Sequence, residues 1–400
     1  MDGHGEGPMK LPVSVALAGL ALTGVVAKFS GSTDSAPDFR EVSLAVGKGP
    51  GPIVVADVNE DGKPDLIVAN EDSENLTVLL GDGKGHFQNA SGSPVAAGHL
   101  PNDIAVGDMN RDGHLDLVIA NHQSPFLTVL LGDGKGGFHP AAGSPFDVHS
   151  NPHPHGVVVG AFSSTGVLDA VTDSWGDNRI ELLKGDGKGG LQTPGHYFAV
   201  GRRPYERLRT ADFNHDGHPD IVTTNLEDDT ASILLGDGKG GLQQAAGSPV
   251  AAGAKPWQVA IDDFNGDGNA DLAIIPYERD VADAGRVVVT VLLGNGKGGF
   301  VPLVQRLSLE GCHGPNSIAT GDFNGDGHRN IAVRCAESSR VVLFLGHAEP
   351  GHPELTFSRF VQPASNGWGG IAVGDLNGDG RDDLVTSDPD NGSITLYLSR

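Results

Sequence analysis

An acidic nine-residue pattern recurs along the chain, and its side chains are of the types that bind hard cations. In the first copy, Asp57, Asn59, Asp61 and Asp65 stand at positions 1, 3, 5 and 9, and Gly62 stands at position 6. Alternate residues of a tight loop can converge on one point, a glycine permits the sharp turn, and calcium prefers carboxylate and amide oxygens. No cysteine or histidine stands at ligand spacing, which disfavours zinc and copper in these loops. We therefore predict calcium, up to six ions, one in each intact loop.

The predicted calcium ligands occupy positions 1, 3, 5 and 9 of each loop, and the backbone carbonyl of position 7 is a further ligand. They are Asp57, Asn59, Asp61, Asp65, Asp108, Asn110, Asp112, Asp116, Asp212, Asn214, Asp216, Asp220, Asp263, Asn265, Asp267, Asp271, Asp322, Asn324, Asp326, Asp375, Asn377, Asp379 and Asp383. In the sixth loop Asn330 replaces the ninth-position aspartate, which should weaken that site. A seventh, eroded copy at residues 161–169 keeps one carboxylate, Asp169, and we expect no ion there. The alternative is a loop of Asx turns that tolerates aspartate and glycine without a metal.

The acidic loops belong to a repeat whose other parts are short strands. The first positions of the seven copies, from residue 57 to residue 375, are 51 to 59 residues apart. Each unit holds apolar runs such as residues 53–56, 66–69 and 76–80, followed by a glycine-rich hairpin at residues 81–85 and a fourth run. Such runs bounded by Gly, Asn and Asp predict four antiparallel strands per unit. Four-stranded units at a period near fifty residues predict a β-propeller.

The two ends of the repeat region fit each other. The last unit stops at Leu398 without a fourth strand, and the first unit is preceded by an unassigned strand-like run at residues 39–42. We therefore predict an all-β fold, a closed seven-bladed β-propeller of four-stranded antiparallel blades, with the N-terminal strand completing the last blade. This single domain should span residues 37–400. An open solenoid would need capping elements that the sequence does not offer.

The N-terminal residues predict export. Residues 1–30 form a predicted leader or signal peptide, because Lys10 precedes an apolar run at residues 11–27 that is short for a membrane span. An uncleaved anchor is the alternative. We expect a secreted, cell-surface or periplasmic protein, with no stable membrane span after signal cleavage. In that setting the two cysteines, Cys312 and Cys335, are predicted to pair, and two separate buried thiols are the alternative.

The charge balance excludes one class of partner. Lys and Arg number 27 against 51 Asp and Glu, so the formal net charge is −24. Nucleic acids and anionic membranes would repel such a chain, since binding to them depends on basic side chains. We expect no nucleic-acid partner, a monomer, and cations as the natural ligands of the acidic loops.

The links between the repeats differ from one another, unlike the acidic loops. They lie on the predicted rim of the ring opposite the acidic loops, where one asymmetric ligand site would produce such variety. The candidate ligand-binding residues are Asn102, His155, Tyr205, Glu206, Arg207, Trp257, Asn316 and Trp368, joined by Trp175, Tyr277 and Glu278 from the turns after the second strands. Aromatic faces beside amides and charged groups favour a saccharide. Alternatively, each tryptophan packs between blades. The histidines at positions 149, 153, 155 and 196 could bind a metal or act as a base, or cluster by accident.

Three of the acidic phrases resemble a known repeat family. The segments 107–113, 321–327 and 374–380 are similar to FG-GAP or VCBS repeats. The resemblance implies a seven-bladed, calcium-binding propeller like those of integrin alpha-chain heads, some fungal lectins and many bacterial secreted proteins. It does not imply one activity, because the family includes adhesins, lectins and accessory domains of polysaccharide-degrading enzymes.

The sequence thus favours a secreted, calcium-stabilised binding module, lectin-like or adhesive, whose partner is a glycan or a cell-surface protein. A carbohydrate-active enzyme, such as a polysaccharide lyase or hydrolase, is an alternative, although no nucleophile elbow, HExxH or P-loop motif supports it. A protein-interaction scaffold without a small ligand is the other alternative.

Overall fold

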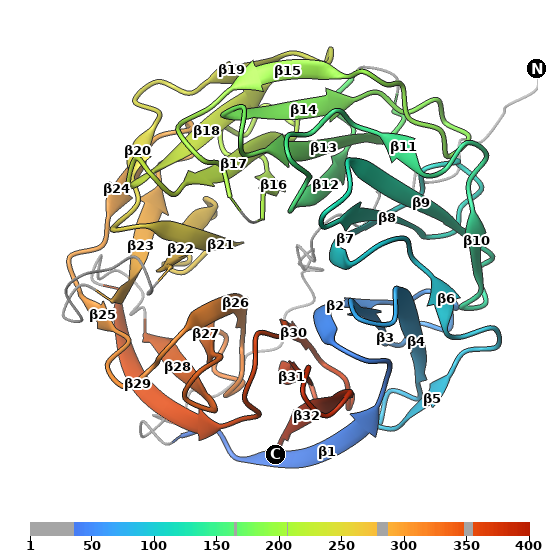
Figure 1. The fold of residues 1–400 in the computed structure, drawn as a ribbon. Helices are drawn as coiled ribbons and strands as arrows, with labels where there is room; N and C mark the ends of the chain where they lie inside the picture. The colour runs from blue at the N-terminus through green and yellow to red at the C-terminus, as the bar shows by residue number, and fades with distance from the viewer. Residues whose placement is uncertain (1–35, 164–165, 206, 278–286, 348–354) are drawn as a thin grey trace, which may run out of the picture.

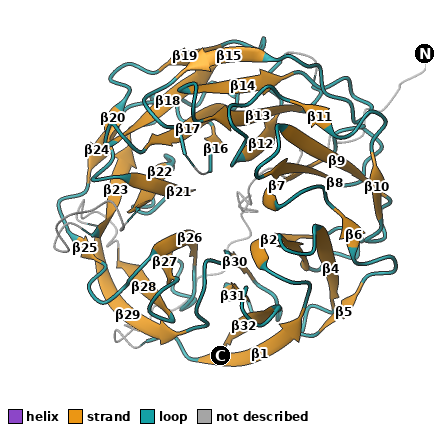
Figure 2. Cartoon of the chain, viewed as in Figure 1, coloured by secondary structure: helices purple, strands orange, loops and turns teal. Residues whose placement is uncertain are grey.

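The chain folds into a ring of seven antiparallel β-sheets. The computed structural model describes residues 36–163, 166–205, 207–277, 287–347 and 355–400, and within them every regular element is a strand. The sheets stand around a common axis like the blades of a propeller (Figure 1), and Figure 2 shows strands and loops alone. The predicted all-β, seven-bladed propeller with four-stranded antiparallel blades is confirmed.

The blades follow the chain, and the first strand of each lies nearest the axis. Blade 1 holds β2 (Pro50–Ala56), β3 (Asp65–Asn70), β4 (Asn75–Gly81), β5 (Phe87–Asn89) and the short β6 (Val95–Ala96); blade 2 holds β7 (Pro101–Gly107), β8 (Asp116–Asn121), β9 (Phe126–Gly132), β10 (Phe138–Pro140) and β11 (Phe146–Asp147). Blade 3 holds β12 (Val157–Gly160), β13 (Asp169–Ser174), β14 (Arg179–Leu183) and β15 (His196–Ala199); blade 4 holds β16 (Arg209–Ala211), β17 (Asp220–Asn225), β18 (Thr230–Gly236), β19 (Leu242–Gln244) and β20 (Val250–Ala251).

The remaining three blades complete the circle. Blade 5 holds β21 (Pro256–Asp262), β22 (Asp271–Pro276), β23 (Val288–Gly294), β24 (Phe300–Pro302) and β25 (Leu307–Ser308); blade 6 holds β26 (Pro315–Gly321), β27 (Asn330–Cys335), β28 (Arg340–His347) and β29 (Thr356–Pro363). Blade 7 holds β30 (Ile371–Gly374), β31 (Asp383–Asp388), β32 (Ser393–Ser399) and β1 (Phe39–Ala45).

The apolar core is divided into layers between neighbouring blades. Successive strand residues point to opposite faces, so Leu66 and Val68 of β3 pack toward blade 7, while Ile67 and Ala69 pack toward blade 2. All four side chains are fully buried. The described residues form seven such clusters, one for each blade interface, including the interface between blades 7 and 1. Each blade therefore depends on both neighbours for its burial.

The first described strand belongs to the last blade. β1 runs antiparallel to β32, from the pair Phe39 and Ser399 to the pair Ala45 and Ser393. Blade 1 also contacts blade 7 directly, because the N–H of Gly85 donates to the carbonyl of Leu376 (2.9 Å).

The predicted leader, residues 1–30, lies outside the described residues. Within the part of the chain that the structure describes, no helix is long and apolar enough to cross a membrane.

Candidate functional site

The two rims of the propeller carry different kinds of loops. The acidic loops connect the first and second strands of each blade, and they share one rim with the glycine-rich hairpins between the third and fourth strands. On this acidic rim the N–H of Gly136 in blade 2 donates to the carbonyl of Val58 in blade 1 (3.1 Å), and Gly298 in blade 5 donates to Phe213 in blade 4 (2.9 Å). The links between blades and the turns after the second strands form the opposite rim.

Each acidic loop is held by its own backbone. In blade 4, the two carboxylate oxygens of Asp212 accept the N–H groups of Asp216 (3.2 Å) and Gly217 (2.8 Å), and Oδ1 of Asn214 accepts the N–H of Asp216 (3.1 Å). The carboxylate of Asp216 in turn accepts the N–H of His218 (2.9 Å). The same bonds recur in the loops of blades 1, 2, 5 and 7. The side chains at positions 1, 3 and 5 are thus oriented into the loop and stay near solvent.

The aspartate at position 9 has a structural role that sequence reasoning missed. Asp220 is fully buried, and its Oδ2 accepts the N–H of Phe213 (2.8 Å) while its Oδ1 accepts the N–H of Gly236 on the third strand (2.8 Å). The equivalent bonds occur at Asp65, Asp116, Asp271 and Asp383. Position 9 therefore fastens the loop to the blade.

Burial of this carboxylate makes its charge costly. Desolvation raises the pKa of Asp116, Asp220 and Asp383 to about 6 and that of Asp271 to about 7, against the opposing effect of the N–H bonds. The carboxylates at positions 1 and 5 add to the rise in Asp220 and Asp271. A cation bound beside position 9 would relieve both effects.

On the opposite rim, β-bulges present selected residues to the axis. In blade 2, Pro101 pairs with Asn121 and Asp103 with Ala120, so Asn102 has no partner across the sheet. Trp257 in blade 5 and Asn316 in blade 6 sit at the same kind of bulge, each directly after a proline. A bulge turns a side chain out of the regular pleat. The bulge in blade 1, between Pro50 and Ile53, holds Gly51 and Pro52.

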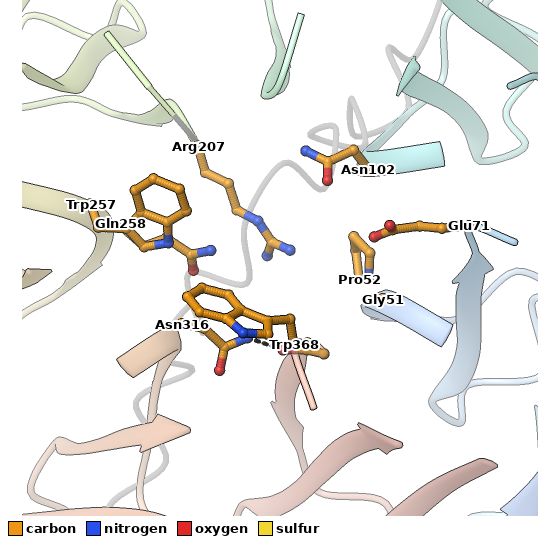
Figure 3. A pocket seen from close by; sticks show the side chains of 11 residues that line it. Gly51, Pro52, Glu71, Asn102, Arg207, Trp257, Gln258, Asn316 and Trp368 are labelled. Carbon is orange, nitrogen blue, oxygen red and sulfur yellow. Dashed lines mark hydrogen bonds between the residues drawn. The ribbon is translucent and has the colours of Figure 1, made fainter. Parts of the chain in front are cut away.

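These bulged residues surround a hollow of about 180 Å³ at the axis (Figure 3). Its lining comes from six blades and consists of Gly51, Pro52, Glu71, Asn102, Arg207, Trp257, Gln258, Asn316, Trp368, Gly369 and Gly370. In Figure 3 the guanidinium of Arg207 and the carboxylate of Glu71 point into the hollow from opposite sides. Nε of Arg207 also lies 3.6 Å from Oδ1 of the buried Asp103.

The structure brings together five of the eight predicted ligand-binding residues. Asn102, Arg207, Trp257, Asn316 and Trp368 line the hollow. Tyr205 and His155 lie beside it, since the Tyr205 ring is 4.8 Å from the Trp257 ring and 4.1 Å from the His155 ring. Glu206 and Glu278 lie outside the described residues.

The two tryptophans of the hollow differ in exposure. Trp257 is 6 % exposed and stacks on Tyr277, with ring centroids 4.5 Å apart, so it contributes mainly to packing between blades 5 and 6. Trp368 is 37 % exposed. Trp368 is therefore the more exposed of the two rings.

Two predicted asparagines connect neighbouring blades. Nδ2 of Asn102 donates to the carbonyl of His155 in blade 3 (2.9 Å), and Nδ2 of Asn316 donates to the carbonyl of Gly369 beside blade 7 (2.6 Å). Each bond uses one of the two N–H donors of the amide and ties two neighbouring blades together.

A buried arginine fixes the loop that carries Trp368. Arg334 on β27 is fully buried, and its guanidinium donates to the carbonyls of Gly367, Asn366 (3.3 Å) and Ser387 (2.8 Å). Desolvation lowers the pKa of Arg334 to about 10, which leaves it charged at neutral pH. Sequence reasoning missed this residue.

Some lining residues that sequence reasoning missed stand at the same positions of the repeat as predicted residues of other blades. The segment Pro50-Gly51-Pro52 stands in blade 1 where Pro101-Asn102 stands in blade 2, and it lacks a large side chain. Glu71 follows the second strand of its blade, as Trp175 and Tyr277 do in theirs. An alignment of the repeats could have found both.

The predicted histidine group is only partly assembled. His153 and His155 lie together, and they are joined by His122 from the turn after β8, whereas His149 and His196 are not part of the cluster. One ring nitrogen from each of His122, His153 and His155 lies within 4.8 Å of the other two. Among the described residues, no other group of three His, Cys, Asp or Glu side chains meets that spacing. Burial, with the neighbouring imidazoles, lowers the pKa of His122 and of His153 to about 4.

The two cysteines form a disulfide at the same rim. Sγ of Cys312 and Sγ of Cys335 are 2.02 Å apart, which ties the link before β26 to the end of β27.

Comparison with known proteins identifies the repeat. Residues 57–119 and 212–274 match a family model described as an FG-GAP-like repeat, and residues 367–397 match the FG-GAP repeat. This chain contains FG-GAP repeats. The resemblance seen in the sequence is thereby confirmed, and the matched segments include five of the six intact acidic loops.

Relatives of the FG-GAP propeller are distant. Integrin alpha-IIb of Mus musculus is 28 % identical over an alignment of 161 residues that covers 36 % of this chain and 15 % of the integrin, so the chain spans a small part of that relative. Among solved structures, BBS1N in complex with ARL6DN has a TM-score of 0.58 at 14 % identity, covering 91 % of this chain and 97 % of that chain. The periplasmic gluconolactonase PpgL of Pseudomonas aeruginosa has a TM-score of 0.57 at 18 % identity, covering 80 % and 86 %. At these identities the likeness concerns the fold alone.

Proposed function

We propose that this FG-GAP propeller is a binding module, lectin-like or adhesive, that takes a saccharide in the axial hollow on a scaffold stabilised by calcium. The observation that carries the proposal is the convergence of six individual blade edges on one hollow, with the exposed ring of Trp368 beside Arg207, Glu71 and Asn102. An aromatic face packs against the apolar side of a sugar ring, and nearby polar groups bind its hydroxyls.

The size of the hollow favours a small group. Its volume of about 180 Å³ is below the roughly 300 to 1,000 Å³ typical of sites for drug-sized ligands. One sugar ring, such as the end of a glycan chain, is the occupant we propose. The fold does not choose between binding and catalysis, since the solved relatives include an enzyme and a protein bound to another protein.

Glycan-array binding of the unmodified protein and of Trp368→Ala tests the proposal. We expect a loss of at least tenfold in affinity, equivalent to about 1.4 kcal/mol, because the ligand loses its aromatic face. Tyr197→Ala is the matched control, since Tyr197 is 43 % exposed on the outer strand β15. Equal losses in the two variants, or no glycan binding at all, would overturn the proposal. Conversion of a bound polysaccharide to shorter products would favour the enzyme alternative.

Calcium in the six acidic loops is the second part of the proposal. The donor set of carboxylate and amide oxygens suits a hard cation. Burial raises the pKa of the position-9 carboxyl groups, and a bound cation would stabilise their charged form. The residues that would hold the ions are those at positions 1, 3, 5 and 9 of each loop. Metal analysis of protein dialysed against calcium should give up to six ions per chain.

We also infer that β1 locks the ring. The strand pairs with β32 over seven residues and packs Val42 and Leu44 against the core between blades 7 and 1. Removal of residues 1–45 should lower the melting temperature, whereas removal of residues 1–35 should leave it unchanged. An equal melting temperature for both truncations would contradict this role.

Export of the protein is the last part of the proposal. The disulfide between Cys312 and Cys335 supports an oxidising compartment, since structural disulfides are rare in the cytosol. Fractionation of the source cells should place the protein at the cell surface, in the periplasm or in the medium. Recovery in the cytosol with reduced cysteines would contradict it.

A further inference from the structure

We propose a second metal site on the rim opposite the acidic loops, in which His122, His153 and His155 bind one zinc ion. Imidazole nitrogens are ligands for zinc and copper, whereas calcium prefers oxygen. This site is therefore chemically distinct from the acidic loops.

The three histidines come from two adjacent blades. His122 follows β8 in blade 2, and His153 and His155 lie in the link that leads to β12 in blade 3. The ring centroids are 4.4 Å apart for His122 and His153, 5.1 Å for His122 and His155, and 4.8 Å for His153 and His155. A bound ion would thus connect the two blades at this rim.

The sequence around the pair favours a common direction for the rings. Pro154 separates His153 from His155, and a residue before proline is restricted to extended backbone. In extended backbone, residues two apart point to the same side. The His-Pro-His segment therefore presents two imidazoles to the position of His122.

The buried histidine carries the strongest evidence for a ligand. His155 is 1 % exposed, and neither of its ring nitrogens has a hydrogen-bond partner among the described residues. Buried polar groups are nearly always satisfied. A metal ion on one of these nitrogens would supply the interaction that the described protein groups do not provide.

A buried carboxylate is placed to orient His155. Oδ1 of Asp173 accepts the N–H groups of His155 (2.8 Å) and Gly156 (2.7 Å), and its Oδ2 lies 3.4 Å from Nδ1 of His155. Metal-binding histidines usually direct their other nitrogen toward such a carboxylate. This arrangement leaves Nε2 of His155 for the metal and makes Asp173 a positioning residue.

The spacing needs only a small contraction. With zinc–nitrogen distances of about 2.0 to 2.1 Å, nitrogens around a tetrahedral zinc ion lie roughly 3.3 Å apart. The observed limit of 4.8 Å thus requires movements of about 1.5 Å or less. Rotation of the half-buried His122 and His153 rings can supply them. Three protein ligands are the number found in catalytic zinc sites, where water or a ligand completes the coordination.

Zinc titration by calorimetry, in a buffer with excess calcium, tests the site. We expect one zinc ion per chain, and binding weakened about 100-fold or more in His122→Ala and His153→Ala, since even loss of an orienting partner weakens metal binding about 10- to 100-fold. His149→Ala and His196→Ala are the matched controls, because both residues are exposed and lie outside the cluster. Losses in the controls as large as those in the cluster variants would overturn the assignment.

Two further measurements do not depend on removing a ligand. Cobalt added to the unmodified protein should give the intense visible absorption of a four-coordinate nitrogen site, and its absence would overturn the proposal. Asp173→Asn keeps an oxygen for the two backbone N–H groups and should weaken zinc binding about 10- to 100-fold. Its melting temperature without zinc should stay near that of the unmodified protein. Unchanged zinc affinity in Asp173→Asn would show that Asp173 does not position His155 for zinc. Glycan binding is measured separately, so either proposal can fail alone.

Discussion

The eroded loop of blade 3 and the intact loop of blade 4 differ in the residues that face the ion site and agree in the residues that face the core. Blade 3 has Ala161 and Ser163 where blade 4 has Asp212 and Asn214. Both loops nevertheless keep a phenylalanine at position 2 and a buried aspartate at position 9, which in blade 3 is Asp169.

The retained residues make similar contacts in the two blades, although the aspartate at position 9 accepts the N–H of position 3 in blade 3 and that of position 2 in blade 4. Oδ2 of Asp169 accepts the N–H of Ser163 (2.9 Å), and its Oδ1 accepts the N–H of Gly185 on the third-strand side (3.0 Å). The carbonyl of Phe162 accepts the N–H of Gly240 from blade 4 (2.8 Å), and its ring is fully buried between the two blades. Positions 2 and 9 therefore serve the fold, while positions 1, 3 and 5 are free to serve an ion.

Truncation of the position-2 side chain should have the largest effect. Phe162→Ala and Phe213→Ala should each destabilise the protein by about 3 to 5 kcal/mol, because each leaves a cavity between blades. Urea unfolding with and without calcium measures the effect. Phe162→Leu is the control and should cost less than about 1.5 kcal/mol, since Leu376 occupies this position in blade 7. A small loss of stability in Phe162→Ala beside a large loss in Phe213→Ala would show that position 2 does not have the same packing role in the two blades.

Removal of the position-9 carboxylate should cause the second-largest loss of stability. Asp169→Ala and Asp220→Ala should each cost about 2 to 4 kcal/mol, because two buried N–H groups lose their acceptor. The loss should be similar in calcium and in chelator for Asp169→Ala. Asp169→Asn should be milder, since Oδ1 of Asn330 accepts the N–H of Phe323 in blade 6 (2.9 Å). Stability of Asp169→Ala equal to that of the unmodified protein would contradict the structural role of position 9.

Changes at positions 1 and 3 should depend on calcium. Asp212→Ala gives blade 4 the residue that blade 3 already has, and it should remove up to about 2.7 kcal/mol of stability at calcium a hundredfold above Kd. With chelator present the loss of stability should be smaller, limited to the two backbone N–H groups whose bonds to Asp212 are removed. Ser163→Ala is the control and should show no calcium-dependent change. Melting temperatures of both variants at several calcium concentrations measure the effect, and equal losses with and without calcium would exclude ion binding in blade 4.

The sixth loop offers the smallest change. Asn330→Asp adds one carboxylate to the loop and should tighten its calcium affinity by on the order of tenfold. Without calcium the variant should be slightly less stable, because the added charge is buried. A calcium-dependent melting curve that does not shift to lower calcium concentration would contradict the assignment of position 9 as a ligand.

The sequence predicted the fold and much of the hollow because both repeat. A period near fifty residues and four short strands per unit leave few architectures besides a propeller. The residue after the blade-link proline was found in most blades for the same reason, as at Asn102, Trp257 and Asn316.

The residues that were missed depend on three-dimensional neighbours. Position 9 was predicted as a ligand, and its bonds to backbone N–H groups need the orientation of the side chain, which spacing does not give. His122 lies in another blade from His153 and His155, and sequence reasoning grouped His149 and His196 with that pair instead. The sequence around Arg334 shows only that it lies in a strand. Its role depends on the contact with the loop at Gly367, which is 33 residues away along the chain.

Residues 39–45 pair with residues 393–399. During synthesis β1 therefore leaves the ribosome early and stays unpaired with β32 until residues 393–399 have been translated. A chain that stops before residue 393 lacks the strand that pairs with β1, so blade 7 can form only after residues 393–399 have been made.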